Sequence, residues 1–157
     1  MLRQITLALA LLLPGTALAA DWAYEGGGTP IAYIDTGGAQ LQFACRGGDL
    51  AMGFWVRQPT RSVAGAATMS VALTPDPPQG GTIFAQDMPL IHSDGSSVIV
   101  RGPVARQWAA TAQRARTELH VAYARHSGNG GLDFLDAATF SARGSAAAIR
   151  QVLAQCG

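Results

Sequence analysis

The stretch that decides the fold runs from Gln40 to Arg57 and reads QLQFACRGGDLAMGFWVR. Apolar residues alternate with polar or small ones on both sides of the four-residue loop RGGD, which is the pattern of a β-hairpin with one buried face. The pairs are then Cys45 with Leu50, Phe43 with Met52, and Leu41 with Phe54. Because this one register puts both apolar faces on the same side, it predicts a half-buried hairpin in which Cys45 points into the core.

Further strands are predicted on both sides of this hairpin. Period-two patterns or short β-rich runs cover residues 31–35, 68–74, 82–86, 97–101, 117–125 and 132–142. The segment 75–81, PDPPQGG, cannot continue a ladder and is expected to be a loop, and residues 93–96 form a polar turn.

Two helices are predicted among these strands. The first covers about 103–115, with Pro103 as its first residue. The second covers about 146–156, with Ser145 as its N-cap. The inward stripes are expected to be Val104, Trp108, Thr111 and Ala115 in the first helix, and Ala146, Ile149, Val152, Leu153 and Cys156 in the second. The fold class is therefore α+β: an antiparallel β-rich domain with a short mid-chain helix and a C-terminal helix packed on the sheet.

The first twenty residues have the features of a secretory signal peptide. Arg3 supplies the positive end, the run 5–13 is apolar, and Ala17-Leu18-Ala19 is a small-residue cleavage pattern. We expect cleavage near Ala19 or Ala20, which leaves residues 21–157 as one exported domain, periplasmic or secreted. No later stretch is long enough to cross a membrane, and no cysteine stands at the cleavage site to carry a lipid.

Charge and composition limit the compartment and the classes of partner that we expect. All eleven basic residues are arginine, and the Ala-, Gly- and Arg-rich usage is typical of a GC-rich bacterium, which together with the leader favours the periplasm. Without Arg3, ten arginines balance ten acidic residues and are spread along the chain. Long-range attraction to nucleic acid or to an anionic membrane is therefore not expected.

Cys45 and Cys156 are the only cysteines, and each is expected on the inward face of its own element. In an oxidising compartment they predict a disulfide that ties the C-terminal helix to the hairpin. A loop of about 110 residues would contribute about 4–5 kcal/mol in the chain-entropy treatment. A redox pair or free nucleophile is the alternative, but no Cys-x-x-Cys spacing supports it.

Two polar clusters could carry chemistry. The run His92-Ser93-Asp94, with Ser96 and Ser97 nearby, allows a hydrolase, although a polar turn explains it and no Gly-x-Ser-x-Gly motif is present. Glu118, His120 and His126 could hold a metal weakly, but solvated positions on a sheet face explain them as well. We therefore expect no catalytic residue, no metal and no cofactor.

Trp55 lies on the strand face opposite Phe54, beside Ala51 and Gly53. We expect it to belong to a second buried face under a packed helix or sheet. The alternative is an exposed anchor for a partner, in a binding surface made of Trp55, Arg57, His92 and Asp94.

Two stretches carry a resemblance to a known family. They are Leu41-x-Phe43-x-Cys45-Arg46 with the turn and strand that follow, and Phe140 to Ser145 with Ala148-Ile149, Val152-Leu153 and Cys156. Together they resemble the type VI secretion-associated accessory family of small periplasmic proteins, which has a Cys-bearing hairpin and a terminal helix ending in Cys. The resemblance covers the hairpin and the last eighteen residues, with Cys45 and Cys156 as the matching positions, and implies a non-catalytic accessory role.

Three functions are consistent with these patterns. The first is a non-enzymatic periplasmic protein that binds another protein of the cell envelope. The second is an inhibitor or small-ligand binder that presents its loops 75–81 and 92–97 on a rigid domain. The third is a hydrolase that uses His92 or His120.

Overall fold

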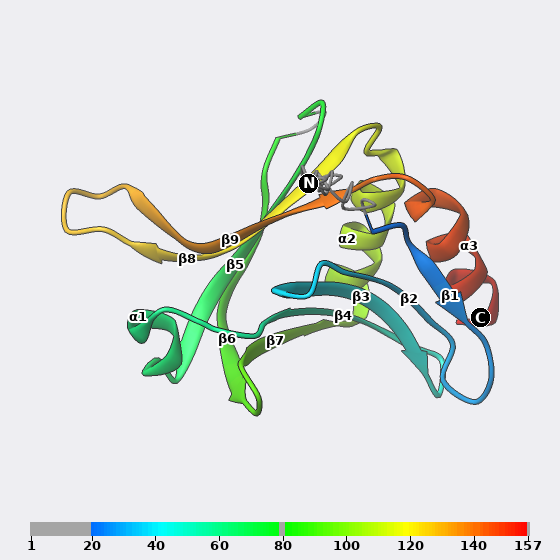
Figure 1. Cartoon of the computed structure of the whole chain (residues 1–157), viewed down its shortest axis with the longest axis horizontal. Coiled ribbons are helices and arrows are strands. Elements are labelled where there is room, and N and C mark those ends of the chain that lie inside the picture. Colours follow the sequence, from blue (N-terminus) through cyan, green and yellow to red (C-terminus); the bar gives the residue numbers. More distant parts are fainter. Residues whose placement is uncertain (1–19, 79–80, 157) are drawn as a thin grey trace, which may run out of the picture.

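The computed structural model describes residues 20–78 and 81–156, which form one antiparallel sheet and three helices (Figure 1). The sheet has nine strands in the order β1-β2-β3-β4-β7-β6-β5-β8-β9. This confirms the predicted β-rich domain with a mid-chain and a C-terminal helix. No helix in the described ranges is long and apolar enough to cross a membrane. The strands are β1 (Ala23–Glu25), β2 (Ile31–Asp35), β3 (Ala39–Arg46), β4 (Asp49–Val56), β5 (Thr68–Pro75), β6 (Ile83–His92), β7 (Ser96–Arg101), β8 (Glu118–His126) and β9 (Leu132–Ser141), and the helices are α1 (Arg61–Ala64), α2 (Gly102–Arg114) and α3 (Ser145–Gln155).

The β3–β4 hairpin has the predicted register. Cys45 pairs with Leu50, and Leu41 pairs with Phe54. The alternating apolar side chains of both strands are fully buried, with Leu41, Phe43, Leu50, Met52 and Phe54 at 0 % exposure. The pairing therefore follows from burial of one face, because a slip by one residue would expose all of these side chains.

The sheet curls around a single core. Helices α2 and α3 lie together on one side of it, and the far half of the sheet bends round toward them (Figure 1). The ring of Phe54 in β4 lies 5.0 Å from that of Tyr123 in β8 and 6.3 Å from that of Phe140 in β9. The buried Tyr123 hydroxyl donates a 2.7 Å hydrogen bond to the Ser96 carbonyl oxygen. The two halves of the sheet thus meet across shared aromatic packing.

Helix α2 begins one residue before the predicted start and turns a slightly different face inward. Trp108 and Thr111 are buried as expected, but Val104 is 41 % exposed and Ala115 is only partly buried. The buried stripe instead includes Ala105, Ala109 and Ala112. Small side chains allow the helix backbone to lie close to the sheet, so the alanines and not the valine occupy the interface.

Ser145 is the first residue of helix α3, so the prediction that it is the N-cap was wrong. The N-cap is Gly144, whose φ of 82° suits glycine, and Ser145 donates from its buried hydroxyl to the Ala112 carbonyl oxygen in α2. The hydroxyl therefore joins the two helices. Of the predicted inward stripe, Ile149, Val152 and Cys156 are fully buried, whereas Ala146 and Leu153 are only partly buried. Ala148 is buried in place of Ala146.

The predicted disulfide is present. Cys45 in β3 and Cys156 after α3 are bridged, with their Cα atoms 5.5 Å apart, and both residues are buried. The bridge holds the C-terminal helix on the hairpin. The described part of the chain contains no free cysteine.

Strand β6 is longer than the predicted run 82–86 and continues to His92. It pairs with β5 as far as Pro89 and with β7 from Leu90 onward. Proline has no N–H for a ladder, so a change of partner at this point accommodates it. The sequence patterns also missed two short elements, β1 and α1. The predicted leader falls on residues 1–20, of which 1–19 lie outside the described residues.

Candidate functional site

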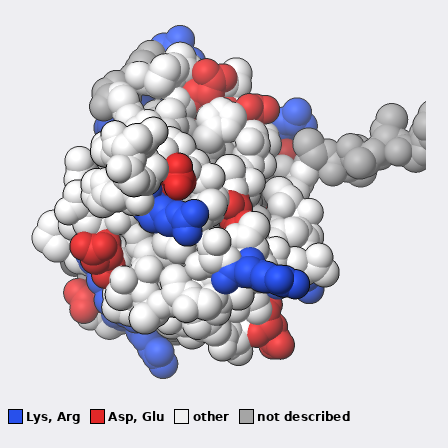
Figure 2. All heavy atoms as spheres, turned by 90° about the vertical axis from the view of Figure 1, so that its left-hand side faces the viewer, with Lys and Arg blue, Asp and Glu red and all other residues white. Residues whose placement is uncertain are grey.

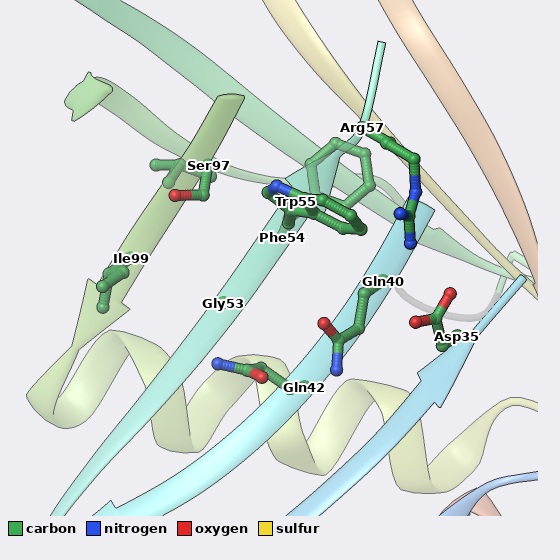
Figure 3. A pocket seen from close by; sticks show the side chains of 10 residues that line it. Asp35, Gln40, Gln42, Gly53, Phe54, Trp55, Arg57, Ser97 and Ile99 are labelled. Carbon is green, nitrogen blue, oxygen red and sulfur yellow. The ribbon is translucent and has the colours of Figure 1, made fainter. Parts of the chain in front are cut away.

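The candidate site is a hollow on the sheet face turned away from α2 and α3. It has a volume of about 340 Å³ and lies over the β2, β3, β4 and β7 strands. Figure 3 shows Trp55 and the polar side chains of the hollow on one side of these strands, with Phe54 and α2 behind the sheet. We call it the Trp55 hollow. Its side-chain lining on the open face is Asp35, Gln40, Gln42, Trp55, Arg57, Ser97 and Ile99, with Gly53 in the floor and the core residues Phe54 and Val98 beneath it.

Trp55 and Arg57 form the wall at one end. The Trp55 side chain is only partly buried, so the predicted second core face is wrong at this position. The Arg57 guanidinium lies over the indole, 4.9 Å from the ring centre, and the Arg57 Nε donates a 2.8 Å hydrogen bond to the Gly37 carbonyl oxygen. Stacking and hydrogen bonding together fix the orientation of both side chains.

The turn at Gly95 supports Trp55 from the side. Gly95 has a φ of 132°, and a Cβ built there would collide with the Val56 carbonyl oxygen and lie 2.7 Å from the Trp55 Nε1. Only glycine permits this close approach between the β6–β7 turn and the end of β4. The turn at Gly95 therefore packs directly against the edge of the Trp55 indole.

The floor of the hollow is formed by Gly53 and Gln42. These residues are cross-strand partners, and a Cβ on Gly53 would come within 3.0 Å of the Gln42 Cγ and Nε2. The missing side chain at Gly53 thus leaves the space into which the Gln42 amide folds. Gln40 faces Trp55 in the same way, as its partner in the ladder.

Asp35 lies at the same end of the hollow, beside Arg57 (Figure 3). Its Oδ1 accepts a 2.6 Å hydrogen bond from the Gly37 N–H, so the turn that holds Arg57 also holds this carboxylate. Within the described residues, Asp35 and Arg57 form no ion pair with each other. The hollow thus has one charge of each sign, and both are held in place by the Gly37 peptide units.

The four predicted surface residues do not form one patch. Trp55 and Arg57 lie together in the hollow. His92 pairs with Ser96, whereas Trp55 pairs with Ser97, so His92 is on the opposite face of the sheet. Asp94 is exposed in the β6–β7 turn, next to Gly95, and does not line the hollow.

His92 and Ser96 do contact each other, which bears on the hydrolase alternative. The His92 Nδ1 lies 2.8 Å from the Ser96 Oγ, and its Nε2 lies 2.9 Å from the Ala66 carbonyl oxygen. An imidazole in this arrangement can accept the hydroxyl proton. However, Ser96 is completely buried, so a substrate has no access to its Oγ.

The second polar cluster is on the outer face of β8. The His120 Nδ1 contacts the Thr139 Oγ1 at 3.1 Å, and its Nε2 lies 3.6 Å from the Glu118 Oε2, with both side chains about half exposed. In residues 20–78 and 81–156 no three metal-ligating side chains gather in one place. The geometry is that of a solvated strand face.

A second hollow of about 280 Å³ lies on the outer face of β5, β8 and β9. Its floor is mainly alanine, and Phe134, which is 54 % exposed, forms one wall. We call it the Phe134 hollow. Its lining is Ala72, Thr74, His120, Val121, Ala122, Phe134 and Ala137, which offers few polar contacts.

Charged side chains do not gather on the exposed face that Figure 2 shows, where acidic and basic groups are interspersed.

The sequence patterns did not identify Asp35, Gln40 and Gln42 as residues of the site. The predicted hairpin register already places Gln40 opposite Trp55 and Gln42 opposite Gly53. Asp35 could not be found in this way, because the partner of its strand was not predicted.

Comparison with known proteins finds no relative of this chain. No protein-family model matches the chain, and neither a curated protein nor a solved structure shows significant similarity to it.

Proposed function

We propose that this protein is a non-enzymatic binding protein of the bacterial cell envelope and that the Trp55 hollow is its binding site. The observation that carries the proposal is a partly buried tryptophan beside a fixed arginine and two glutamines on an open sheet face. Concave surfaces that combine an aromatic anchor with a few oriented polar groups are typical of binding sites. The resemblance to the type VI secretion-associated accessory family supports a non-catalytic role.

Export to the periplasm is part of the proposal. It is supported by the leader-like residues 1–20 and by the Cys45–Cys156 bridge, because disulfides persist in oxidising compartments. The partner that the family resemblance implies is another envelope protein. A hydrolase has less support, since Ser96, whose hydroxyl contacts the His92 ring, is buried.

Affinity capture tests this proposal. The mature protein is used as bait in a periplasmic extract, next to Trp55→Ala and to the matched control Phe134→Ala, which removes an aromatic side chain from the other hollow. We expect the wild type and Phe134→Ala to retain the same specific partner and Trp55→Ala to lose it. Absence of any specific partner, or retention by Trp55→Ala, would contradict the proposal.

A small-ligand binder is the second candidate. The volume of the Trp55 hollow, about 340 Å³, is within the range of small-molecule sites, and this favours it. An inhibitor that presents both predicted loops has less support. The loops 75–81 and 92–97 lie at opposite ends of β6, so they cannot act together on one target.

A further inference from the structure

The Trp55 hollow contains polar groups that the protein itself does not use. Among the described residues, neither the Gln40 nor the Gln42 side chain forms a hydrogen bond, although both are partly buried. Toward the same described residues, the Arg57 side chain hydrogen-bonds only through its Nε, to the Gly37 carbonyl oxygen, and the Asp35 side chain only through its Oδ1. Two amides, the outer guanidinium nitrogens and one carboxylate oxygen therefore remain available to a ligand.

These groups are both donors and acceptors. Each glutamine amide offers one oxygen and two N–H groups, the guanidinium only donates, and the carboxylate only accepts. A ligand that matches them needs several groups that can donate and accept in turn. Hydroxyl groups do this, because each has one proton and two lone pairs.

The charges of the hollow favour an uncharged ligand. Among the residues that the structure describes, Asp35 and Arg57 are the only ionisable ones in its lining, and their charges are opposite. An anionic ligand would meet the Asp35 carboxylate, and a cationic ligand would meet the Arg57 guanidinium. Like charges brought together in a site lower affinity and select against such ligands.

Trp55 adds an apolar surface to this polar set, on the part of its indole that Arg57 does not cover. Its indole is held by Arg57 and by the Gly95 turn, so little conformational entropy is lost when a ligand packs against it. A sugar ring has an apolar C–H face and a rim of hydroxyl groups, which matches an aromatic side chain surrounded by planar hydrogen-bonding groups. We propose that the Trp55 hollow binds an uncharged carbohydrate.

This inference rests on the proposed function, since it requires the Trp55 hollow to be the binding site, and it specifies that the group of the envelope partner that enters the hollow is an uncharged carbohydrate. Calorimetry tests it on the mature, oxidised protein with maltotriose, cellotriose and triacetylchitotriose as neutral probes and trigalacturonate as a charged one. We expect at least one neutral trisaccharide to bind, and trigalacturonate to bind at least about tenfold more weakly.

One double variant and one single variant test whether the trisaccharide binds in the Trp55 hollow. The double variant, Gln40→Ala with Gln42→Ala, removes both amides and is expected to lower affinity at least about tenfold. Gly53→Ala displaces the Gln42 amide, whose flexible end can move, so affinity should fall while the melting temperature stays close to that of the wild type. Phe134→Ala should bind as the wild type does. An unchanged melting temperature in each variant shows that the fold is intact.

Failure of this inference differs from failure of the proposed function. If no trisaccharide binds but Trp55→Ala loses a captured protein, the carbohydrate proposal is wrong and the binding site stands. If a trisaccharide binds the double glutamine variant and Trp55→Ala as tightly as it binds the wild type, it binds outside the hollow and the carbohydrate proposal is wrong. If Trp55→Ala also retains the captured partner, the proposed function is wrong. Tighter binding of trigalacturonate than of every neutral probe would overturn the argument from charge.

Discussion

Opening the Cys45–Cys156 bridge is expected to lower the free energy of unfolding by about 5 kcal/mol. The two cysteines are separated by 111 positions in the sequence, and the chain-entropy relation gives about 4.8 kcal/mol at 25 °C for a loop of that length. Because domains are stable by about 5–15 kcal/mol in total, this is a large share. For a domain of this size it corresponds to a fall in melting temperature of roughly 15–20 °C.

The effect should arise mainly in the unfolded chain. In the folded protein α3 keeps its other contacts, including Ile149 and Val152 in the core and the hydrogen bond from Ser145 to α2. The Arg106 Nη2 also donates a 2.8 Å hydrogen bond to the Cys156 carbonyl oxygen. The reduced protein is therefore expected to fold with α3 in place, and its unfolded state to be more expanded.

Urea denaturation measures this prediction. Wild type is compared with and without a reductant, next to a variant that carries both Cys45→Ala and Cys156→Ala. Reduction leaves both sulfur atoms in the core, so it isolates the covalent link, whereas the double alanine variant also loses their packing. We expect a lower midpoint and a larger denaturant slope in both cases, because a slope grows with the surface exposed on unfolding. A loss below about 1 kcal/mol on reduction, or free alkylation of both thiols in the native protein, would refute the reasoning.

Three further effects follow from individual contacts. Tyr123→Phe removes the hydrogen bond to the buried Ser96 carbonyl oxygen, so denaturation should show a loss of about 1–2 kcal/mol; an unchanged stability would mean that this bond contributes nothing. Burial raises the pKa of Tyr123 above its ordinary value near 10, with the Asp136 charge as a smaller cause. The contribution of the neutral Tyr123 hydroxyl to the free energy of unfolding is therefore complete below about pH 10 and is lost as the pH rises. Wild type should therefore lose up to about 1.4 kcal/mol per pH unit more than Tyr123→Phe above that pH, and parallel curves for the two proteins would contradict this. Gly95→Ala forces a Cβ against the Val56 carbonyl oxygen and should destabilise the protein by about 2 kcal/mol or more, while Gly128→Ala, which meets no atom within 4 Å, should stay close to wild type; equal melting temperatures would show that the turn is not constrained.

The hairpin was predictable because its pattern is local in the sequence, and the disulfide was predictable because several observations agree on it. Alternation on both sides of one short loop leaves a single register that buries both faces, and that register places Cys45 inside. The helical spacing of the last residues puts Cys156 on the inward side. Compartment, burial and the presence of only two cysteines then agree on one disulfide.

Other features depend on contacts that the sequence does not display. The strand predicted at 82–86 continues through Pro89 to His92, because β6 changes partner there. Val104 is a stronger apolar signal than Ala105, yet close packing on the sheet selects the smaller residue. Part of the site could be predicted from the sequence, because the hairpin register already pairs Gln40 with Trp55. The position of Asp35 could not be predicted, since it depends on how β2 pairs.

The most direct test of the central claim, that the Trp55 hollow is the binding site, is photo-crosslinking in the living cell envelope. A benzophenone amino acid replaces Gln40 in the hollow or, as the control, Phe134 in the second hollow. We predict that illumination gives a specific adduct from position 40 and none from position 134. Adducts from position 134 alone, or none from position 40 in a protein that is exported and folded, would contradict the claim.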